Sequence, residues 1–144
     1  MPAWIEAGVA EYLKRFPPSC RLELIEIPAE KRLQDSPKKK LIDNESKKLL
    51  SAIKPGNHII ALEVKGALWS TEKLADQLKA WQANGRNIDM LIGGPDGLSN
   101  ECLQKAETKW SLSPLTLPHP LVRVLVAEQL YRAISILQNH PYHR

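Results

Sequence analysis

The sequence predicts an α/β protein with a mostly parallel sheet and helices on both faces. Strand-like apolar segments alternate with amphipathic segments of about 10 to 15 residues, which is the pattern of β-α-β units. The chain has 144 residues, of which 43% are hydrophobic and 25% charged, as in an ordinary globular protein. We therefore expect residues 1–144 to form a single domain.

The first predicted helix begins near Pro2 and ends at Pro17 and Pro18. Residues 21–27 follow as a short β-prone run that Pro28 closes, and we expect a strand there. The apolar residues of the helix recur at the spacing of one helical face: Ile5, Val9, Tyr12, Leu13 and Phe16.

A second helix is expected to begin at residues 36–37 (Ser-Pro), a favourable N-cap and first-turn pair, and to end before residues 55–56 (Pro-Gly). Residues 58–64 (HIIALEV) are almost continuously apolar, which predicts a strand covered on both faces. Residues 65–66 (Lys-Gly) are expected to form the turn after this strand.

The second half of the chain continues the alternation. Ser70 is predicted to cap a helix that ends at residues 84–85 (Asn-Gly), and residues 87–92 predict a strand. Residues 99–108 are expected to hold a short helix capped by its first serine, and residues 118–137 the final helix.

Two loops are candidates for ligand binding, because ligands in α/β proteins gather where strands end and helices begin. The glycine loop (residues 93–97, GGPDG) follows the strand of residues 87–92, and its glycines let backbone approach a ligand closely. It lacks the spacing of a dinucleotide or P-loop motif, so a simple turn is an equally good interpretation of this segment alone. The leucine loop (residues 112–117, LSPLTL) is apolar, and the pair suits an adenine-bearing ligand better than a polyphosphate.

The end of the chain is cationic. From residue 108 onward Glu128 is the single acid, and Tyr142 and His143 lie close to the end, where they are suited to RNA phosphate and base contacts. A frayed terminus is the ordinary alternative. The histidines and the two cysteines, Cys20 and Cys102, lack the spacing of a zinc site, so we expect no metal.

The composition also bounds the location. No apolar run approaches the roughly 20 residues that cross a bilayer, and the first residues lack the pattern of a secretory signal. We expect a cytoplasmic protein without membrane contact. The net charge of +4 permits an anionic partner.

Several segments resemble the ribosomal large subunit methyltransferase H family. They are residues 90–99 (MLIGGPDGLS), 111–133 (SLSPLTLPHPLVRVLVAEQLYRA), 139–144 (NHPYHR) and 23–29 (ELIEIPA), so the resemblance spans the chain. It implies the SPOUT class of methyltransferase with a deep C-terminal trefoil knot. The activity it implies is methyl transfer from S-adenosylmethionine to N3 of a pseudouridine in 23S rRNA on the ribosome, by a homodimer packed through its last helix.

The resemblance also implies site residues. Arg132, Tyr142 and His143 would face the target nucleotide, with the tail of one subunit completing the cofactor site of the other. The cofactor-binding residues it implies come from three segments: Leu62, Gly93, Gly94, Leu112, Ser113, Pro114, Leu115, Thr116 and Leu117.

One departure from the family pattern concerns the start of the chain. Family members begin with an additional apolar strand ahead of the segment that matches residues 1–2, and we expect this chain to lack it. Two other functions remain open, and only the first of them follows from the missing strand. One is a catalytically impaired RNA- or ribosome-binding module, and the other is a nucleotide-binding enzyme that holds phosphates on the glycine loop.

Overall fold

The computed structural model describes residues 1–33 and 35–143, and Arg144, the last residue of the tail motif, lies outside that part. The chain divides into two compact units, and each unit combines segments that are distant in sequence. The first unit contains Met1–Leu24, Trp69–Gly85 and Leu117–Arg144. The second contains Ile25–Leu68 and Arg86–Thr116.

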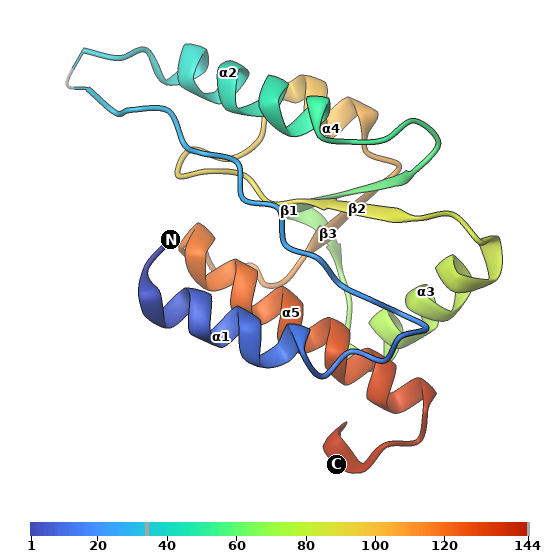
Figure 1. Ribbon diagram of the computed structural model, residues 1–144. Helices are drawn as coiled ribbons and strands as arrows, with labels where there is room; N and C mark the ends of the chain where they lie inside the picture. Colours follow the sequence, from blue (N-terminus) through green and yellow to red (C-terminus); the bar gives the residue numbers. More distant parts are fainter. Residues whose placement is uncertain (34, 144) are drawn as a thin grey trace. The chain divides into compact units, whose positions relative to one another are not determined.

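The second unit is built on a three-stranded sheet with the order β2-β1-β3. Its strands are β1 (His58–Leu68), β2 (Ile88–Leu91) and β3 (Thr108–Ser111), and β1 pairs in parallel with both neighbours. Figure 1 shows β1 between the other two strands. The parallel sheet confirms the predicted α/β class, because parallel neighbours require crossover connections such as the helices between them.

The register of the sheet fixes which residues share its carboxyl edge. Ala61 lies opposite Leu91 of β2 and Lys109 of β3. The segments that follow β2 and β3 therefore start at the carboxyl edge of the sheet, close to Leu62 of β1. This edge positions the candidate cofactor site.

The predicted turn at residues 65–66 is wrong, because β1 continues through it to Leu68. The pairing of β1 with β3 shifts register between Leu62 and Ala67, so the glycine marks an irregularity inside the strand. A Cβ on Gly66 would lie 2.7 Å from the carbonyl carbon of Lys109. The glycine is needed because two backbones approach closely at this position.

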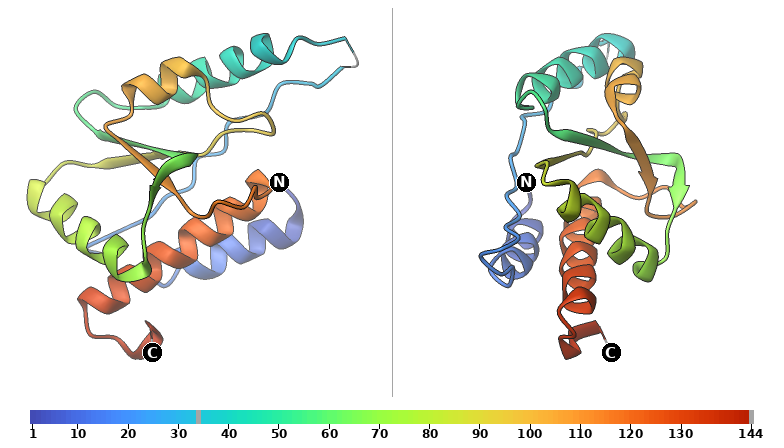
Figure 2. Two further views of the ribbon diagram at one scale, coloured as in Figure 1. Left: turned by 180° about the vertical axis from the view of Figure 1, so that it is seen from behind. Right: turned by 90° about the vertical axis from the view of Figure 1, so that its right-hand side faces the viewer.

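Two helices complete the second unit. The helix α2 (Lys38–Ser51) agrees with the prediction but begins after Pro37, one residue later than expected. The helix α4 (Asn100–Lys105) is capped by Ser99 as predicted and is shorter than expected, since Thr108 belongs to β3. Figure 2 shows α2 and α4 side by side.

The first unit is helical. It consists of α1 (Ala3–Leu13), α3 (Thr71–Asn84), α5 (His119–Leu137) and the short 3-10 helix η1 (Pro141–His143). The predicted bounds of α3 are confirmed: the Ser70 hydroxyl accepts from Lys73 N at 3.1 Å, and Gly85 ends the helix with φ of 69°. In Figures 1 and 2, α1 runs along α5.

Apolar side chains hold the three helices of the first unit together. Ile5 of α1 is fully buried, and Phe16, just after α1, stacks at a tilt on Tyr131 of α5 with ring centroids 5.9 Å apart. On α3, Leu74 and Leu78 are buried as the spacing predicted. Across the part of the chain that the structure describes, no helix is both long enough and apolar enough to span a membrane.

The strand predicted for residues 21–27 is wrong. This segment forms neither helix nor strand, and Ile25 is 59% exposed. The prediction rested on side-chain preference, whereas a strand exists only where its backbone groups pair with a neighbour. No strand among the described residues pairs with this segment.

Candidate active site

The glycine loop is a tight backbone turn at the end of β2. Gly97 N donates to the Gly94 carbonyl oxygen at 3.0 Å, and the same residues form an isolated antiparallel bridge. Gly97 has φ of +90°, which L side chains rarely adopt. A Cβ on Gly93 would lie 2.6 Å from the Gly97 carbonyl carbon, so residue 93 must also be glycine. The loop is thus a compact turn after β2, and of its three glycines Gly97 is the one with nothing within 4 Å of the position that a Cβ would take.

A buried carboxylate lies against this loop. The Glu45 side chain of α2 is only 6% exposed, and a Cβ on Gly94 would lie 3.0 Å from Glu45 Oε1. The Glu30 backbone N–H donates to Glu45 Oε2 at 2.9 Å, and the Arg32 guanidinium donates to both carboxylate oxygens at 2.5 and 2.9 Å. A buried charge of this kind needs such partners.

The Arg32 guanidinium also reaches the glycine loop itself. Its second amine donates to Asp96 Oδ2 at 3.1 Å, so one side chain joins Glu45 to the loop. The hydrogen bond to Glu45 first, and the pairing with Asp96 in addition, raise the pKa of Arg32 above its usual value. Arg32 is therefore a permanent cation between two carboxylates.

The segment after the glycine loop is fixed by the next residue of α2. The buried Ser46 hydroxyl accepts from Ser99 N at 3.0 Å, and the Ser99 hydroxyl in turn accepts from Cys102 N at 3.2 Å. These contacts lock the first turn of α4 against α2. Cys102 is buried, as expected for a free thiol of structural character.

The leucine loop follows β3. Its first turn is closed by side chains: the Ser111 hydroxyl donates to the Ser113 carbonyl oxygen at 3.0 Å, and Leu115 N donates to the Ser113 hydroxyl at 3.0 Å. Leu115 is 71% exposed, so the loop presents an apolar side chain to solvent. Pro114 and Thr116 are exposed as well.

The three predicted cofactor segments therefore start from the carboxyl edge of the sheet. Leu62 follows Ala61 in β1, the glycine loop begins two residues after Leu91, and Leu112 follows the last residue of β3. Neighbouring strands lie about 4.8 Å apart, so the three starting points fall within about 10 Å across the sheet. Leu117, the last residue of the leucine loop, already belongs to the first unit.

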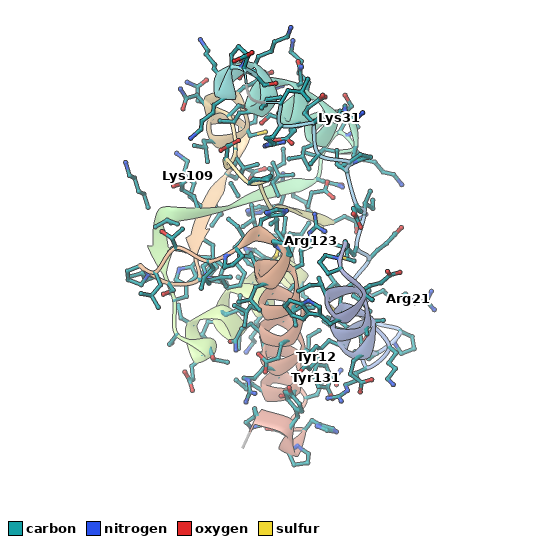
Figure 3. The ribbon with its side chains drawn as sticks, turned by 90° about the vertical axis from the view of Figure 1, so that its left-hand side faces the viewer. Tyr12, Arg21, Lys31, Lys109, Arg123 and Tyr131 are labelled. Carbon is teal, nitrogen blue, oxygen red and sulfur yellow. The ribbon has the colours of Figure 1, made fainter. Side chains whose placement is uncertain are left out.

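The residues predicted to face the nucleotide lie together in the first unit. The guanidinium carbon of Arg132 lies 4.9 Å from the centroid of the Tyr142 ring. Glu128 joins them: its Oε1 accepts from Arg132 Nε at 2.8 Å and from the Tyr142 hydroxyl at 3.1 Å. The Arg15 guanidinium lies over the rings of Tyr12, Tyr131 and Tyr142, at 5.2, 5.9 and 5.8 Å from their centroids, and the first two of these tyrosines are labelled in Figure 3.

Electrostatics keep this cluster in one charge state. The hydrogen bond to Glu128 raises the pKa of Arg132. Burial, followed by contact with Tyr12 and the charge of Glu128, raises the pKa of Tyr142 well above its usual value. At neutral pH the cluster therefore holds a cationic guanidinium and a neutral phenol.

The position of His143 indicates which ring nitrogen holds its proton. The Ser135 hydroxyl donates its one hydrogen to the Arg132 carbonyl oxygen at 2.7 Å, and His143 Nδ1 lies 3.2 Å from the same hydroxyl oxygen. Because the hydroxyl hydrogen is already used, Nδ1 is the donor in this contact. In the neutral ring the lone pair is then on Nε2, the atom that can accept a proton.

The structure adds partners to which we assigned no role from sequence: Arg32, Glu45, Ser46, Asp96 and Glu128. Glu128 stands four residues before Arg132 on a predicted helix, a spacing that forms ion pairs and could have revealed it. Glu45 continues the apolar spacing of its helix, and a carboxylate in a core-facing position is itself a signal of a buried partner. Nothing in the sequence pairs Arg32 with Asp96. No group of three or more metal-ligating side chains lies together in residues 1–33 and 35–143.

Comparison with known proteins defines the class. A family model described as "Predicted SPOUT methyltransferase" matches residues 1–143, and the chain belongs to this family. It is therefore a methyltransferase built on the parallel sheet and glycine loop described above.

A particular relative narrows the class further. The chain is 53% identical over 144 residues to the protein named ribosomal RNA large subunit methyltransferase H of Hahella chejuensis (strain KCTC 2396). The match covers all of this chain and 92% of the relative. The resemblance read from the sequence is confirmed.

Proposed function

We propose that this protein transfers a methyl group from S-adenosylmethionine to N3 of a pseudouridine in 23S rRNA of the ribosomal large subunit. The observation that carries the cofactor assignment is the sheet register, which brings Leu62, the glycine loop and the leucine loop to one edge. The name of the 53% identical relative supports the rRNA substrate. We further propose that residues 1–144 work as one domain with a C-terminal trefoil knot, as a cytoplasmic homodimer without a metal.

The glycine loop fits a nucleoside cofactor. Nothing lies within 4 Å of the position that a Cβ on Gly97 would take, so the backbone there is open to a ligand, and apolar Leu115 is exposed on the leucine loop. Backbone amides and carbonyls beside apolar side chains are the mixture that binds an adenine-bearing ligand. Leu62, Gly93, Gly94 and residues 112–117 would hold S-adenosylmethionine, which supplies a methyl group on a positively charged sulfur.

The tail cluster would act on the nucleotide. N3 of a uracil-like ring carries a proton that must leave for the nitrogen to become nucleophilic, and His143 Nε2 is the atom that would accept it. The Arg132 cation would stabilise the negative charge that develops on the ring. Tyr142, kept neutral by its surroundings, offers a ring for stacking and a hydroxyl for hydrogen bonding.

The homodimer proposal concerns α5. Leu130 is only 5% exposed within its own chain, so an arginine at this position would disrupt folding of the single chain and would not report on the dimer. Leu125 is half-buried and is the better position for a charge. We expect Leu125→Arg to give monomers without methyl transfer, as sedimentation and activity together would show. A fully active monomer would contradict a site shared between subunits.

The direct test is transfer of a labelled methyl group from S-adenosylmethionine to purified ribosomes. We expect label at N3 of one pseudouridine, and none in ribosomes whose rRNA lacks that pseudouridine. His143→Ala should lower the rate of transfer by at least the roughly 100-fold that a positioned base contributes, while cofactor affinity stays near wild type. A folded protein that binds ribosomes but no S-adenosylmethionine would instead support the RNA-binding module.

A further inference from the structure

We propose that α2 holds the glycine loop in its cofactor-binding conformation, so that Arg32 and Glu45 are positioning residues for methyl transfer. This inference rests on the proposed function, since it concerns how the same site is held. All the contacts involved lie within the second unit of the chain.

The first contact is direct packing of a carboxylate on loop backbone. A Cβ on Gly94 would lie 3.0 Å from Glu45 Oε1 and 3.3 Å from Glu45 Cδ, which is closer than ordinary van der Waals contact. Glu45 itself cannot withdraw easily, because it is held by Arg32 and by the Glu30 backbone N–H. The loop therefore rests on a fixed polar surface.

The second contact is the hydrogen bond that links Arg32 to Asp96 of the loop. Arg32 donates to Glu45 and to Asp96, and the Asp96 side chain is only 20% exposed. If Glu45 loses its charge, the guanidinium loses its strongest partner and its geometry at Asp96 is no longer fixed. The ion pair at Glu45 is thus coupled to the position of the loop.

The third contact fixes the far end of the segment. Ser46, next to Glu45 on α2, accepts from Ser99 N at 3.0 Å, just beyond the glycine loop. Two consecutive residues of one helix therefore contact Gly94 and Ser99. A regular helix keeps such neighbours at a fixed distance, so α2 sets the span of the loop.

A loop with three glycines in five residues needs external support of this kind. Glycine has more backbone freedom than any other residue, so ordering the loop at the moment of binding would weaken affinity. Support from α2 orders the loop before the cofactor arrives. An apolar side chain at position 45 would supply no hydrogen bond to Arg32.

The test compares three variants by calorimetric titration with S-adenosylmethionine. Glu45→Gln and Asp96→Asn each break one link to Arg32, and Glu107→Gln is the matched control. Glu107 forms a two-pronged pair with Arg86 at 2.5 and 3.0 Å, and this pair precedes β3 and β2, at the opposite edge of the sheet.

We expect Glu45→Gln to raise the dissociation constant for S-adenosylmethionine about tenfold and Asp96→Asn severalfold, as loss of a charged hydrogen bond at this position implies. The turnover number at saturating cofactor should stay near wild type, which separates positioning from chemistry. Glu107→Gln should leave the dissociation constant unchanged, whatever it does to the melting temperature.

Cofactor affinity within twofold of wild type in Asp96→Asn would overturn the inference, and so would an equal loss in Glu107→Gln. Should Glu45→Gln fail to fold, Asp96→Asn decides the question alone, because that side chain lies on the loop and can be solvated when released. A wild-type protein that binds no S-adenosylmethionine would overturn the proposed function as well. Wild-type binding with unaffected variants would overturn only the role of α2.

Discussion

Replacing Gly93 by alanine tests the geometry of the glycine loop with a single carbon atom. The added Cβ would lie 2.6 Å from the Gly97 carbonyl carbon and 2.9 Å from its Cα. Carbon atoms in contact normally lie about 3.5 to 4.0 Å apart, so the two arms of the loop must separate by about 1 Å. Overpacking of this kind costs about 1 to 3 kcal/mol, which corresponds to about 5- to 150-fold in cofactor affinity if the closed loop is the binding form.

The assay is calorimetric titration of folded Gly93→Ala with S-adenosylmethionine, alongside a thermal melt. Gly56→Ala is the control, because residue 56 has φ of +89° and nothing within 4 Å of the new Cβ, and it precedes β1. We expect this control to lose stability through backbone strain while its cofactor affinity stays at the wild-type value. Wild-type affinity in Gly93→Ala would refute the reasoning that the closed loop binds the cofactor.

Three further predictions concern the two units separately. Glu128→Gln removes the carboxylate that Arg132 contacts. Because the Arg132 side chain is 31% exposed, we expect the free energy of unfolding in urea to fall by only about 1 kcal/mol, together with slower methyl transfer. Unchanged turnover would contradict a role of Glu128 in holding Arg132 for the reaction. The hydrogen bond from Arg86 lowers the pKa of Glu107, so this pair stabilises the fold above the usual glutamate pKa, and its contribution is lost as the pH falls through the lower pKa of the folded state. Thermal melts at decreasing pH should therefore show that Glu107→Gln loses less stability than the wild type between about pH 5 and pH 3. Gly66→Ala would place a Cβ 2.7 Å from β3 backbone, and we expect a destabilisation of about 1 to 3 kcal/mol, measured by denaturant unfolding.

Local signals in the sequence predicted most of the elements correctly. Ser70 and Gly85 bound α3 because a hydroxyl at the start and a left-handed glycine at the end satisfy backbone groups that a helix leaves unpaired. At Gly66 the local signal is ambiguous. A Lys-Gly pair is compatible with a turn and with a strand irregularity, and only the approach of β3 at 2.7 Å distinguishes them.

The candidate site shows the same division. The sequence supplied the glycine loop, the leucine loop and the tail residues, because each is a contiguous motif. It indicated no role for Glu45, which contacts Arg32, thirteen residues earlier, and lies against Gly94, or for Asp96 of the loop, which pairs with the same Arg32. Such pairings have no local signature, because the sequence alone does not distinguish Arg32 and Asp96 from the other arginines and aspartates of the chain.

The sequence by itself therefore determined the α/β class, the presence and order of the helices, the bounds of α3 and the family, because caps, periodicity and contiguous motifs act over a few residues. The tertiary structure alone decided that residues 21–27 form no strand, that β1 runs through Gly66, and that a buried carboxylate supports the glycine loop. The physical reason is that strand pairing and charge burial depend on which distant backbone or side chain arrives alongside. That proximity is produced by the packing of the whole unit.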